Sequence, residues 1–201
     1  MSDKIGVFGG SFNPPHNGHL HLLRSVTAHC GLDYTIVIPS FISPHKQPSA
    51  QIAPEARLEM CRLAFTAPGT IVSDTELRRG GTSYTYDTLT ELKRSYNGEL
   101  YLIIGADMLL CFDKWYRYRD ILSIAVLAAA CRTDTDAEPE RLCEKAEELT
   151  LLGGRVVLSD TKPYEMSSTQ IRNAVKNRED ISGYVPAAVA NYIKNGGYYH
   201  G

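Results

Sequence analysis

The chain has 201 residues, and its 43% hydrophobic and 22% charged residues are ordinary for a globular protein, which excludes collagen, a disordered chain and a coiled coil. Its 21 Lys and Arg against 23 Asp and Glu give a net charge of -2, which excludes a protein that coats nucleic acid through charge alone. A chain of this length fits one domain, and we expect a single domain over residues 1–201.

Cysteine usage and hydropathy favour a cytoplasmic chain. The five cysteines have no C-x-x-C spacing and are an odd number, so a zinc ribbon and a secreted disulfide framework are disfavoured. They are Cys30, Cys61, Cys111, Cys131 and Cys143. No secretory signal is visible, and the apolar stretch 121–131 is too short to span a bilayer. We therefore expect reduced thiols and no membrane partner.

Short apolar runs alternate with helical periodicity along the chain. In chain order the predicted elements are strand Lys4–Phe8, helix Gly18–Cys30, strand Tyr34–Pro39, helix Ala53–Ala67, strand Ile71–Ser73, helix Thr85–Tyr96, strand Glu99–Gly105, strand Ile124–Ala130, helix Pro139–Leu149, strand Arg155–Leu158, helix Ser168–Lys176 and helix Pro186–Lys194. Continuous Ile/Val/Leu strands between helices indicate a parallel sheet covered on both faces. The predicted fold class is α/β, a doubly wound parallel sheet in three α/β/α layers.

Ligands of such sheets bind beyond the carboxyl ends of the strands. The first of these ends carries paired glycines and then two histidines, His16 and His19, at the start of a helix. The glycines admit a close approach of a phosphate to the backbone. The segment is neither a G-x-G-x-x-G fingerprint nor a Walker loop. Two imidazoles beside the N–H donors of a helix start predict a site that binds the oxygens of a polyphosphate.

Two other interpretations of these histidines stay open. They are two solvated side chains in a turn, or they bind zinc together with His21. The zinc interpretation lacks a carboxylate or thiol at ligand spacing. Covalent catalysis by a histidine is disfavoured, because His19 and His21 do not face each other on a helix.

A second candidate segment begins the helix after the last predicted strand. Arg172 lies four residues after Ser168 and three after Thr169, so the guanidinium, the hydroxyls and the first amides converge on one anion. The position after the last strand places the segment at the same sheet edge as Gly9 and Gly10. The alternative is an ordinary helix cap with a surface Arg.

Four weaker candidates follow other elements. Lys46 lies in the long loop Phe41–Pro54 and can close over phosphate. Asp107 follows a buried strand, where an acid accepts hydrogen bonds from ribose hydroxyls. Trp115 offers a flat ring for stacking on a heterocycle. The helix that begins at Thr85 offers amides for a carboxylate.

Both segments together resemble the nucleotidylyltransferase superfamily with HxGH and STxIR signatures. The segments that carry the resemblance are Gly9-Gly10-Ser11-Phe12-Asn13-Pro14-Pro15-His16-x-Gly18-His19 and Ser167-Ser168-Thr169-x-Ile171-Arg172. Intermediate motifs (Pro44-His45-Lys46, Ser83-Tyr84-Thr85, Gly105-x-Asp107, Trp115 and Arg132) follow the order of the bacterial nicotinate-mononucleotide adenylyltransferases. The resemblance covers about residues 5–195. Many members have Asp where Asn13 stands here.

The resemblance implies a Rossmann-like nucleotidylyltransferase fold and a reaction. ATP and nicotinate mononucleotide form deamido-NAD and pyrophosphate, with Mg²⁺, by direct in-line attack on the α-phosphorus. It implies catalytic roles for His16, His19, Lys46 and Arg172. The implied ATP-binding residues are Gly9, Gly10, Ser11, Phe12, Gly105, Asp107, Ser168, Thr169 and Ile171. The implied pyridine-nucleotide residues are Tyr84, Thr85, Trp115 and Arg132. It implies no protein ligand for the metal.

Two alternatives to this activity remain at the level of sequence. One is the same transfer to nicotinamide mononucleotide or, less favoured by Tyr84 and Trp115, to phosphopantetheine. The other is a module that binds ATP without turnover, which the presence of both histidines disfavours. Nucleic acid is not an expected partner, and the oligomeric state, a homo-oligomer included, stays open.

Overall fold

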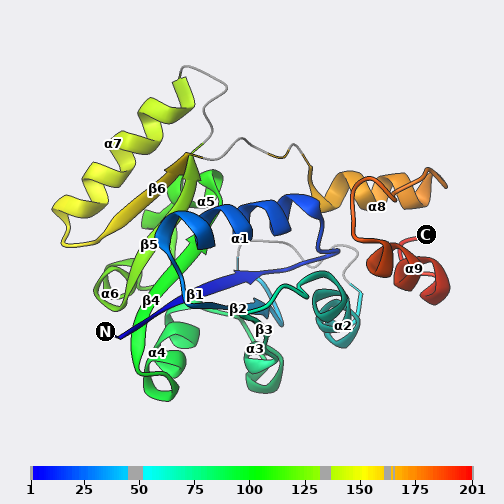
Figure 1. The fold of residues 1–201 in the computed structure, drawn as a ribbon, viewed down its shortest axis with the longest axis horizontal. Coiled ribbons are helices and arrows are strands. Elements are labelled where there is room, and N and C mark those ends of the chain that lie inside the picture. Colours follow the sequence, from blue (N-terminus) through cyan, green and yellow to red (C-terminus); the bar gives the residue numbers. More distant parts are fainter. Residues whose placement is uncertain (1, 45–51, 132–136, 161–163, 165, 201) are drawn as a thin grey trace. The chain divides into compact units, whose positions relative to one another are not determined.

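A computed structural model describes residues 2–44, 52–131, 137–160, 164 and 166–200 of the chain. Its six strands form one sheet in the order β3-β2-β1-β4-β5-β6 (Figure 1). They are β1 (Asp3–Gly10), β2 (Tyr34–Pro39), β3 (Thr70–Val72), β4 (Gly98–Ile104), β5 (Ala125–Cys131) and β6 (Val156–Asp160). Strands β1 and β4, β4 and β5, and β5 and β6 pair in parallel. This order is that of a doubly wound Rossmann-like sheet, which confirms the predicted fold class.

Helices connect and follow the strands along the chain (Figure 1). They are α1 (Asn17–Cys30), α2 (Pro54–Ala64), α3 (Thr75–Arg79), α4 (Thr85–Ser95), α5 (Ala106–Leu110), α6 (Tyr118–Ile124), α7 (Ala137–Leu151), α8 (Ser168–Lys176) and α9 (Ala187–Gly196), with a 3₁₀ turn at Phe112–Lys114. All twelve predicted elements are present, and their ends shift by three residues at most. Central strands are buried along nearly their whole length, as the continuous apolar runs predicted.

The sequence analysis missed α3, α5, α6 and the 3₁₀ turn. These elements have three to seven residues, which is too short for a helical period to show in the sequence. Helix α6 also begins after Arg117, whose φ of 55° lies in the left-handed region. Nothing in the local composition marks that position as a helix start.

The chain divides into two compact units. The first unit comprises Met1–Gly9, Leu22–Ile36 and Tyr84–Pro163, and the second comprises Gly10–His21, Val37–Ser83 and Tyr164–Gly201. In the first unit α5 packs on α7 and α4 on α6, and in the second α2 packs on α9. The second unit thus holds both candidate phosphate segments except Gly9, and the first unit holds the candidate pyridine residues Tyr84, Thr85 and Trp115.

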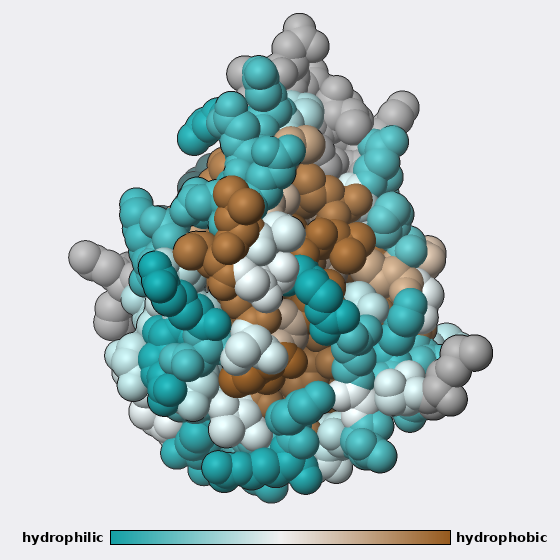
Figure 2. All heavy atoms as spheres, turned by 90° about the vertical axis from the view of Figure 1, so that its left-hand side faces the viewer, coloured by the Kyte–Doolittle hydropathy of each residue, from teal (hydrophilic) through white to brown (hydrophobic). Residues whose placement is uncertain are grey.

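In the first unit the sheet ends at β6, whose Val156, Val157 and Leu158 are half-exposed. Leu151 and Leu152, at the end of α7 and just after it, are 89% and 41% exposed. Figure 2 shows apolar side chains between polar ones on the side of the molecule that carries α7 and β6. Exposed apolar surface is typical of contacts with other chains, but the homo-oligomer stays a prediction. Among the described residues no helix combines the length and the apolar character that crossing a membrane requires.

Candidate active site

The loop from β1 to α1 is fixed at its start by the neighbouring strand. Ser40, directly after β2, donates its N–H to the Gly10 carbonyl at 2.8 Å. Phe12 follows with a φ of 44° and a ring that is 1% exposed. That ring packs edge-on against His19 and against Phe65, with centroids 5.0 and 5.5 Å away. A buried aromatic ring therefore anchors the loop beneath the second histidine.

The two histidines of the H-x-G-H segment lie against each other. Their ring centroids are 3.7 Å apart at 32°, and His16 is only 6% exposed. The backbone N–H of His16 donates to Nδ1 of His19 at 3.1 Å. Because Nδ1 accepts, the neutral His19 ring carries its proton on Nε2, where it is a hydrogen-bond donor. Two imidazolium rings at this separation repel, so the geometry favours at least one neutral ring.

Gly18 stands between the two histidines for a steric reason. A Cβ at this position would lie 3.0 Å from Nδ1 of His16 and 3.1 Å from its Cε1. Any larger residue would require the His16 ring to shift from its place beside His19. The glycine of the motif is therefore explained by packing of the histidine pair.

The second candidate segment begins α8 with a capping box. Ser167 is the N-cap, its Oγ accepts from the Gln170 N–H, and the Gln170 side chain accepts from the Ser167 N–H. Ser168 is therefore not the cap. Its hydroxyl donates instead to the carbonyl of Pro14 at 2.9 Å. The first amides of α8, of Ser168 and Thr169, have no acceptor within the helix.

Arg172 makes the second bond between α8 and the β1–α1 loop. Its Nη1 donates to the Asn13 carbonyl at 2.9 Å, and its Nη2 donates to Oγ1 of Thr169 at 3.0 Å. Ile171 beside it is fully buried and seats the helix. The structure thus brings the two candidate segments, 154 to 159 residues apart in sequence, into direct contact.

The sequence analysis missed two residues that hold the same loop. Arg57 of α2 is 1% exposed, and its Nη1 donates to the Ser11 carbonyl at 2.8 Å. Tyr199, near the C-terminus, donates its hydroxyl to Oδ1 of Asn13 at 2.7 Å. Burial lowers the pKa of Arg57 and raises the pKa of Tyr199. One signal for Arg57 was available, because it lies four residues before the inward-facing Cys61 on the apolar stripe of its helix.

In the first unit two of the candidate pyridine residues, Tyr84 and Trp115, each belong to a pair of aromatic rings. Tyr84 is the N-cap of α4 and makes no side-chain cap hydrogen bond. Its ring lies 4.5 Å from that of Tyr116, which is 53% exposed. Thr85 is the first residue of α4, and Trp115 follows the 3₁₀ turn with its ring 5.2 Å from that of Phe112. The sequence analysis did not single out Tyr116.

The other candidates of the first unit lie at the ends of β1 and β4. Gly9 is exposed, and a Cβ there would meet no described atom within 4 Å. Gly105 is the N-cap of α5, and a Cβ there would lie 2.8 Å from Oδ1 of Asp107. The Asp107 carboxylate therefore folds back over the start of its own short helix. Lys46 and Arg132 lie outside the described residues.

Comparisons with known proteins show the family of the chain. A model described as cytidylyltransferase-like matches residues 7–174. The nicotinate-nucleotide adenylyltransferase of Bacillus subtilis is 34% identical over 198 residues, which are 98% of each chain. The chain belongs to this family of adenylyltransferases. A probable nicotinate-nucleotide adenylyltransferase of Dehalococcoides mccartyi is 36% identical, over 100% of this chain and 98% of the relative.

A solved structure shares the fold of this adenylyltransferase-family chain. It is the Plasmodium falciparum nicotinic acid mononucleotide adenylyltransferase complexed with NaAD, with a TM-score of 0.78 and 98% of each chain covered. The sequence identity is 17%. The match independently supports the doubly wound fold.

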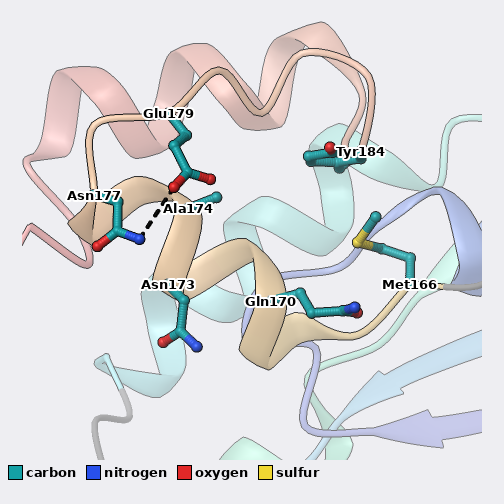
Figure 3. A pocket seen from close by; sticks show the side chains of 7 residues that line it. All are labelled: Met166, Gln170, Asn173, Ala174, Asn177, Glu179 and Tyr184. Atoms are coloured by element: carbon teal, nitrogen blue, oxygen red, sulfur yellow. Dashed lines mark hydrogen bonds between the residues drawn. The ribbon is translucent and has the colours of Figure 1, made fainter.

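The described residues also form a small pocket beside α8. Figure 3 shows that Gln170, Asn173 and Asn177 line it from one face of the helix, with Glu179 hydrogen-bonded to Asn177. None of the predicted site residues lines this pocket. Thr169 and Arg172 are three residues apart and so share a face of α8. Each lies one position before a pocket residue, Gln170 or Asn173, so their face is rotated away from the pocket. The chemistry that the family implies therefore does not belong to this pocket.

The structure gives no support to the interpretation of His16, His19 and His21 as zinc ligands. Within the described ranges no group of three His, Cys, Asp or Glu side chains is placed to hold a metal ion. His21 instead has its ring 6.3 Å from the ring of Tyr164.

Proposed function

We propose that the protein transfers the adenylyl group of ATP to nicotinate mononucleotide and so forms deamido-NAD and pyrophosphate. The family membership and the full-length match to nicotinate-nucleotide adenylyltransferases support this activity. The observation that carries it is the junction of the two motif segments, in which Ser168 and Arg172 bind the carbonyls of the histidine loop. This junction supports the proposal, because it joins the start of α8 to the loop that leads to His16.

The reaction is a direct displacement at phosphorus. The 5′-phosphate of the mononucleotide forms the new P–O bond, and the bond from the α-phosphorus to the pyrophosphate oxygen breaks. The nucleophile is already an anion, so no general base is needed, and catalysis consists of positioning and electrostatics. His19, with its proton on Nε2, donates to the transferring phosphoryl group, and the adjacent His16 shares this role.

The leaving pyrophosphate accepts hydrogen bonds from the donors at the start of α8. The amides of Ser168 and Thr169 bind its oxygens, and Arg172 adds positive charge. Two of the five N–H donors of Arg172 hold Asn13 and Thr169, so three remain for phosphate. Lys46 adds a second cation. ATP phosphates and water would hold Mg²⁺, which prefers oxygen ligands, and the ion would supply positive charge to the phosphates.

The nucleotide backbone and the ribose bind beside Gly9, Gly10 and Gly105. Gly9 admits the nucleotide at the end of β1, because a Cβ there would meet no described atom within 4 Å, and Gly10 continues this backbone beside the Phe12 ring. The folded-back carboxylate of Asp107 beside Gly105 accepts from ribose hydroxyls. Ser11, Phe12 and Ile171 shape the ATP site from the loop and from α8.

The pyridine ring binds among the aromatic residues of the first unit. Trp115 stacks on the ring, and Tyr84, Thr85 and Arg132 surround it. The start of α4 has no side-chain cap, so its first amides receive the nicotinate carboxylate. A neutral carboxamide gains less there and presents N–H donors to N–H donors, which favours the acid over the amide.

Pyrophosphate release from ATP and Mg²⁺, measured in parallel with nicotinate and nicotinamide mononucleotide, tests the proposal. We expect a large preference for the acid. Equal rates with the two mononucleotides would support adenylyl transfer and would contradict the binding of the nicotinate carboxylate by the first amides of α4. No release with either acceptor would contradict the proposed function and leave a module that binds ATP without turnover.

A further inference from the structure

Arg57 links two loops at the carboxyl ends of adjacent strands. It lies in the first turn of α2 and is 1% exposed. Its Nη1 donates to the Ser11 carbonyl at 2.8 Å, and its Nη2 donates to the Phe41 carbonyl at 3.1 Å. Ser11 follows β1 and Phe41 follows β2. One planar guanidinium therefore fixes the start of the histidine loop against the backbone that follows β2.

The positive charge of Arg57 is buried without a carboxylate partner. Within the described part of the chain it forms no ion pair, and its Nε has no hydrogen-bond partner. Burial raises the pKa of Cys61 and of Tyr199, so these two neighbours are neutral. Glu55 and Glu76 favour the charged form only through longer-range attraction. A buried cation with neutral partners is costly in the free protein.

The bond to Ser11 also determines where the next amide points. The Ser11–Phe12 peptide is trans, so the Phe12 N–H points away from the Ser11 carbonyl and from Arg57. Phe12 has a left-handed φ of 44°, a conformation that occurs in anion-binding backbone turns. Ser11 is 8% exposed, and its Oγ has no hydrogen-bond partner among the described residues. A buried hydroxyl of this kind points to a ligand at the loop.

We propose that Arg57 is a positioning residue for polyphosphate, which fixes the Ser11–Phe12 peptide from behind and supplies a buried positive charge that the bound polyphosphate neutralises. This inference rests on the proposed function for the identity of the anion. Arg57 acts through the loop and does not touch the substrate. The buried charge costs stability in the free protein, and the bound anion offsets that cost.

The proposal separates stability from anion affinity. Arg57→Met removes a buried charge, which favours stability, but it leaves the Ser11 and Phe41 carbonyls without their donors, which opposes it. The decisive quantity is therefore the affinity for Mg²⁺-tripolyphosphate, which falls about tenfold in Arg57→Met. Arg57→Lys keeps the charge but cannot bridge two carbonyls in one plane, so its affinity lies between those of wild type and Arg57→Met. A purely structural arginine predicts a lower melting temperature with unchanged affinity.

The experiment is calorimetric titration of the full chain with Mg²⁺-tripolyphosphate, together with thermal melting. The matched control is Arg62→Met on the same helix, because Arg62 is exposed and pairs only with Glu59 among the described residues. We expect Arg62→Met to bind like wild type. Unchanged affinity in Arg57→Met overturns the proposal, as does a wild-type chain that does not bind tripolyphosphate. If Arg57→Met does not fold, unchanged affinity in Arg57→Lys overturns it.

The two proposals fail in distinguishable ways. Tripolyphosphate binding needs neither the pyridine nucleotide nor turnover. A wild-type chain that binds the anion and releases no pyrophosphate contradicts only the proposed function. A wild-type chain that turns over, with Arg57→Met equal to it in kcat and in tripolyphosphate affinity, contradicts only the role of Arg57.

Discussion

In the second unit, side chains from distant parts of the sequence bind the carbonyls and the Asn13 side chain of the β1–α1 loop. Arg57, Ser168, Arg172 and Tyr199 each donate one hydrogen bond at 2.7–2.9 Å. In the first unit, the ring of Tyr84 packs against that of Tyr116, and the ring of Trp115 packs against the buried ring of Phe112. The two regions are therefore held by different forces, directional hydrogen bonds in one and aromatic packing in the other.

The difference fits the two tasks that we assign to the regions. Stabilisation of charge at phosphorus needs donors that are already in place, because reorientation during the reaction would cost the energy that they supply. Recognition of a flat ring needs area and tolerates adjustment of the ring positions. Substitutions in the phosphate region should therefore change kcat, and substitutions in the aromatic region should change the KM of the pyridine nucleotide.

The largest effect should come from the histidine pair. His16→Ala and His19→Ala each remove a donor to the transferring phosphoryl group, and each should lower kcat by about 10²–10³-fold. Pyrophosphate release at saturating substrates measures the change. His21→Ala, on the same helix, is the control and should retain wild-type turnover. Turnover that survives both substitutions would contradict the mechanism.

The next effect separates the two serines at the start of α8. Ser168→Ala leaves the buried Pro14 carbonyl without its donor and should lower kcat about tenfold. Ser167→Ala removes the capping box and should cost about 1 kcal/mol of stability, with little change in kcat. Steady-state kinetics beside chemical denaturation measure both quantities. Equal kinetic effects in the two variants would remove the distinction between the loop contact and the helix cap.

A smaller effect is expected in the aromatic region. Trp115→Ala should raise the KM for nicotinate mononucleotide about five- to tenfold through the loss of stacking area, and the KM for ATP should stay unchanged. Trp115→Phe keeps a ring and should recover most of the affinity. A change in kcat alone would show that Trp115 belongs functionally with the phosphate region.

The smallest effect concerns Tyr199 and its pH dependence. Tyr199→Phe removes the donor to Asn13 and should cost about 1 kcal/mol of stability at pH 7. Burial raises the Tyr199 pKa above its usual value of 10. The stability that this shift contributes is fully present below pH 10 and is lost as the pH rises further, because the unfolded chain ionises first.

Denaturation of wild type and Tyr199→Phe at pH 7 and above pH 10 measures this difference. The advantage of wild type should shrink at the higher pH. Tyr184→Phe is the control, because Tyr184 is 40% exposed, and the variant should behave like wild type at both pH values. If the difference in unfolding free energy between wild type and Tyr199→Phe is the same at both pH values, ionisation of the Tyr199 hydroxyl does not contribute to the pH dependence of stability.

Most of the regular structure followed from local pattern. Strand Tyr34–Pro39 and helix Ser168–Lys176 have the predicted bounds, because an apolar run and a serine cap are local signals. Helices α5 and α6 were missed, because five to seven residues are too few for a period and their positions depend on packing against α7 and α4.

The candidate site divides in the same way. The spacing of His16 with His19 and of Thr169 with Arg172 could be interpreted locally, because residues three apart meet at a helix turn. The roles of Arg57 and Tyr199 could not, because each binds the loop across 46 or more residues of sequence. In the sequence Arg57 is one arginine on an ordinary amphipathic helix, and Tyr199 is one of several aromatic residues near the C-terminus.

The sequence by itself determined the fold class, the order of its elements and the two motif segments, because hydrophobic period, helix caps and motif spacing are properties of neighbouring residues. Only the tertiary structure decided which carbonyls the donors bind, which tautomer His19 adopts and which cation is buried. Those outcomes depend on the burial of polar groups that must find partners from distant segments, and no local pattern encodes which partner they find.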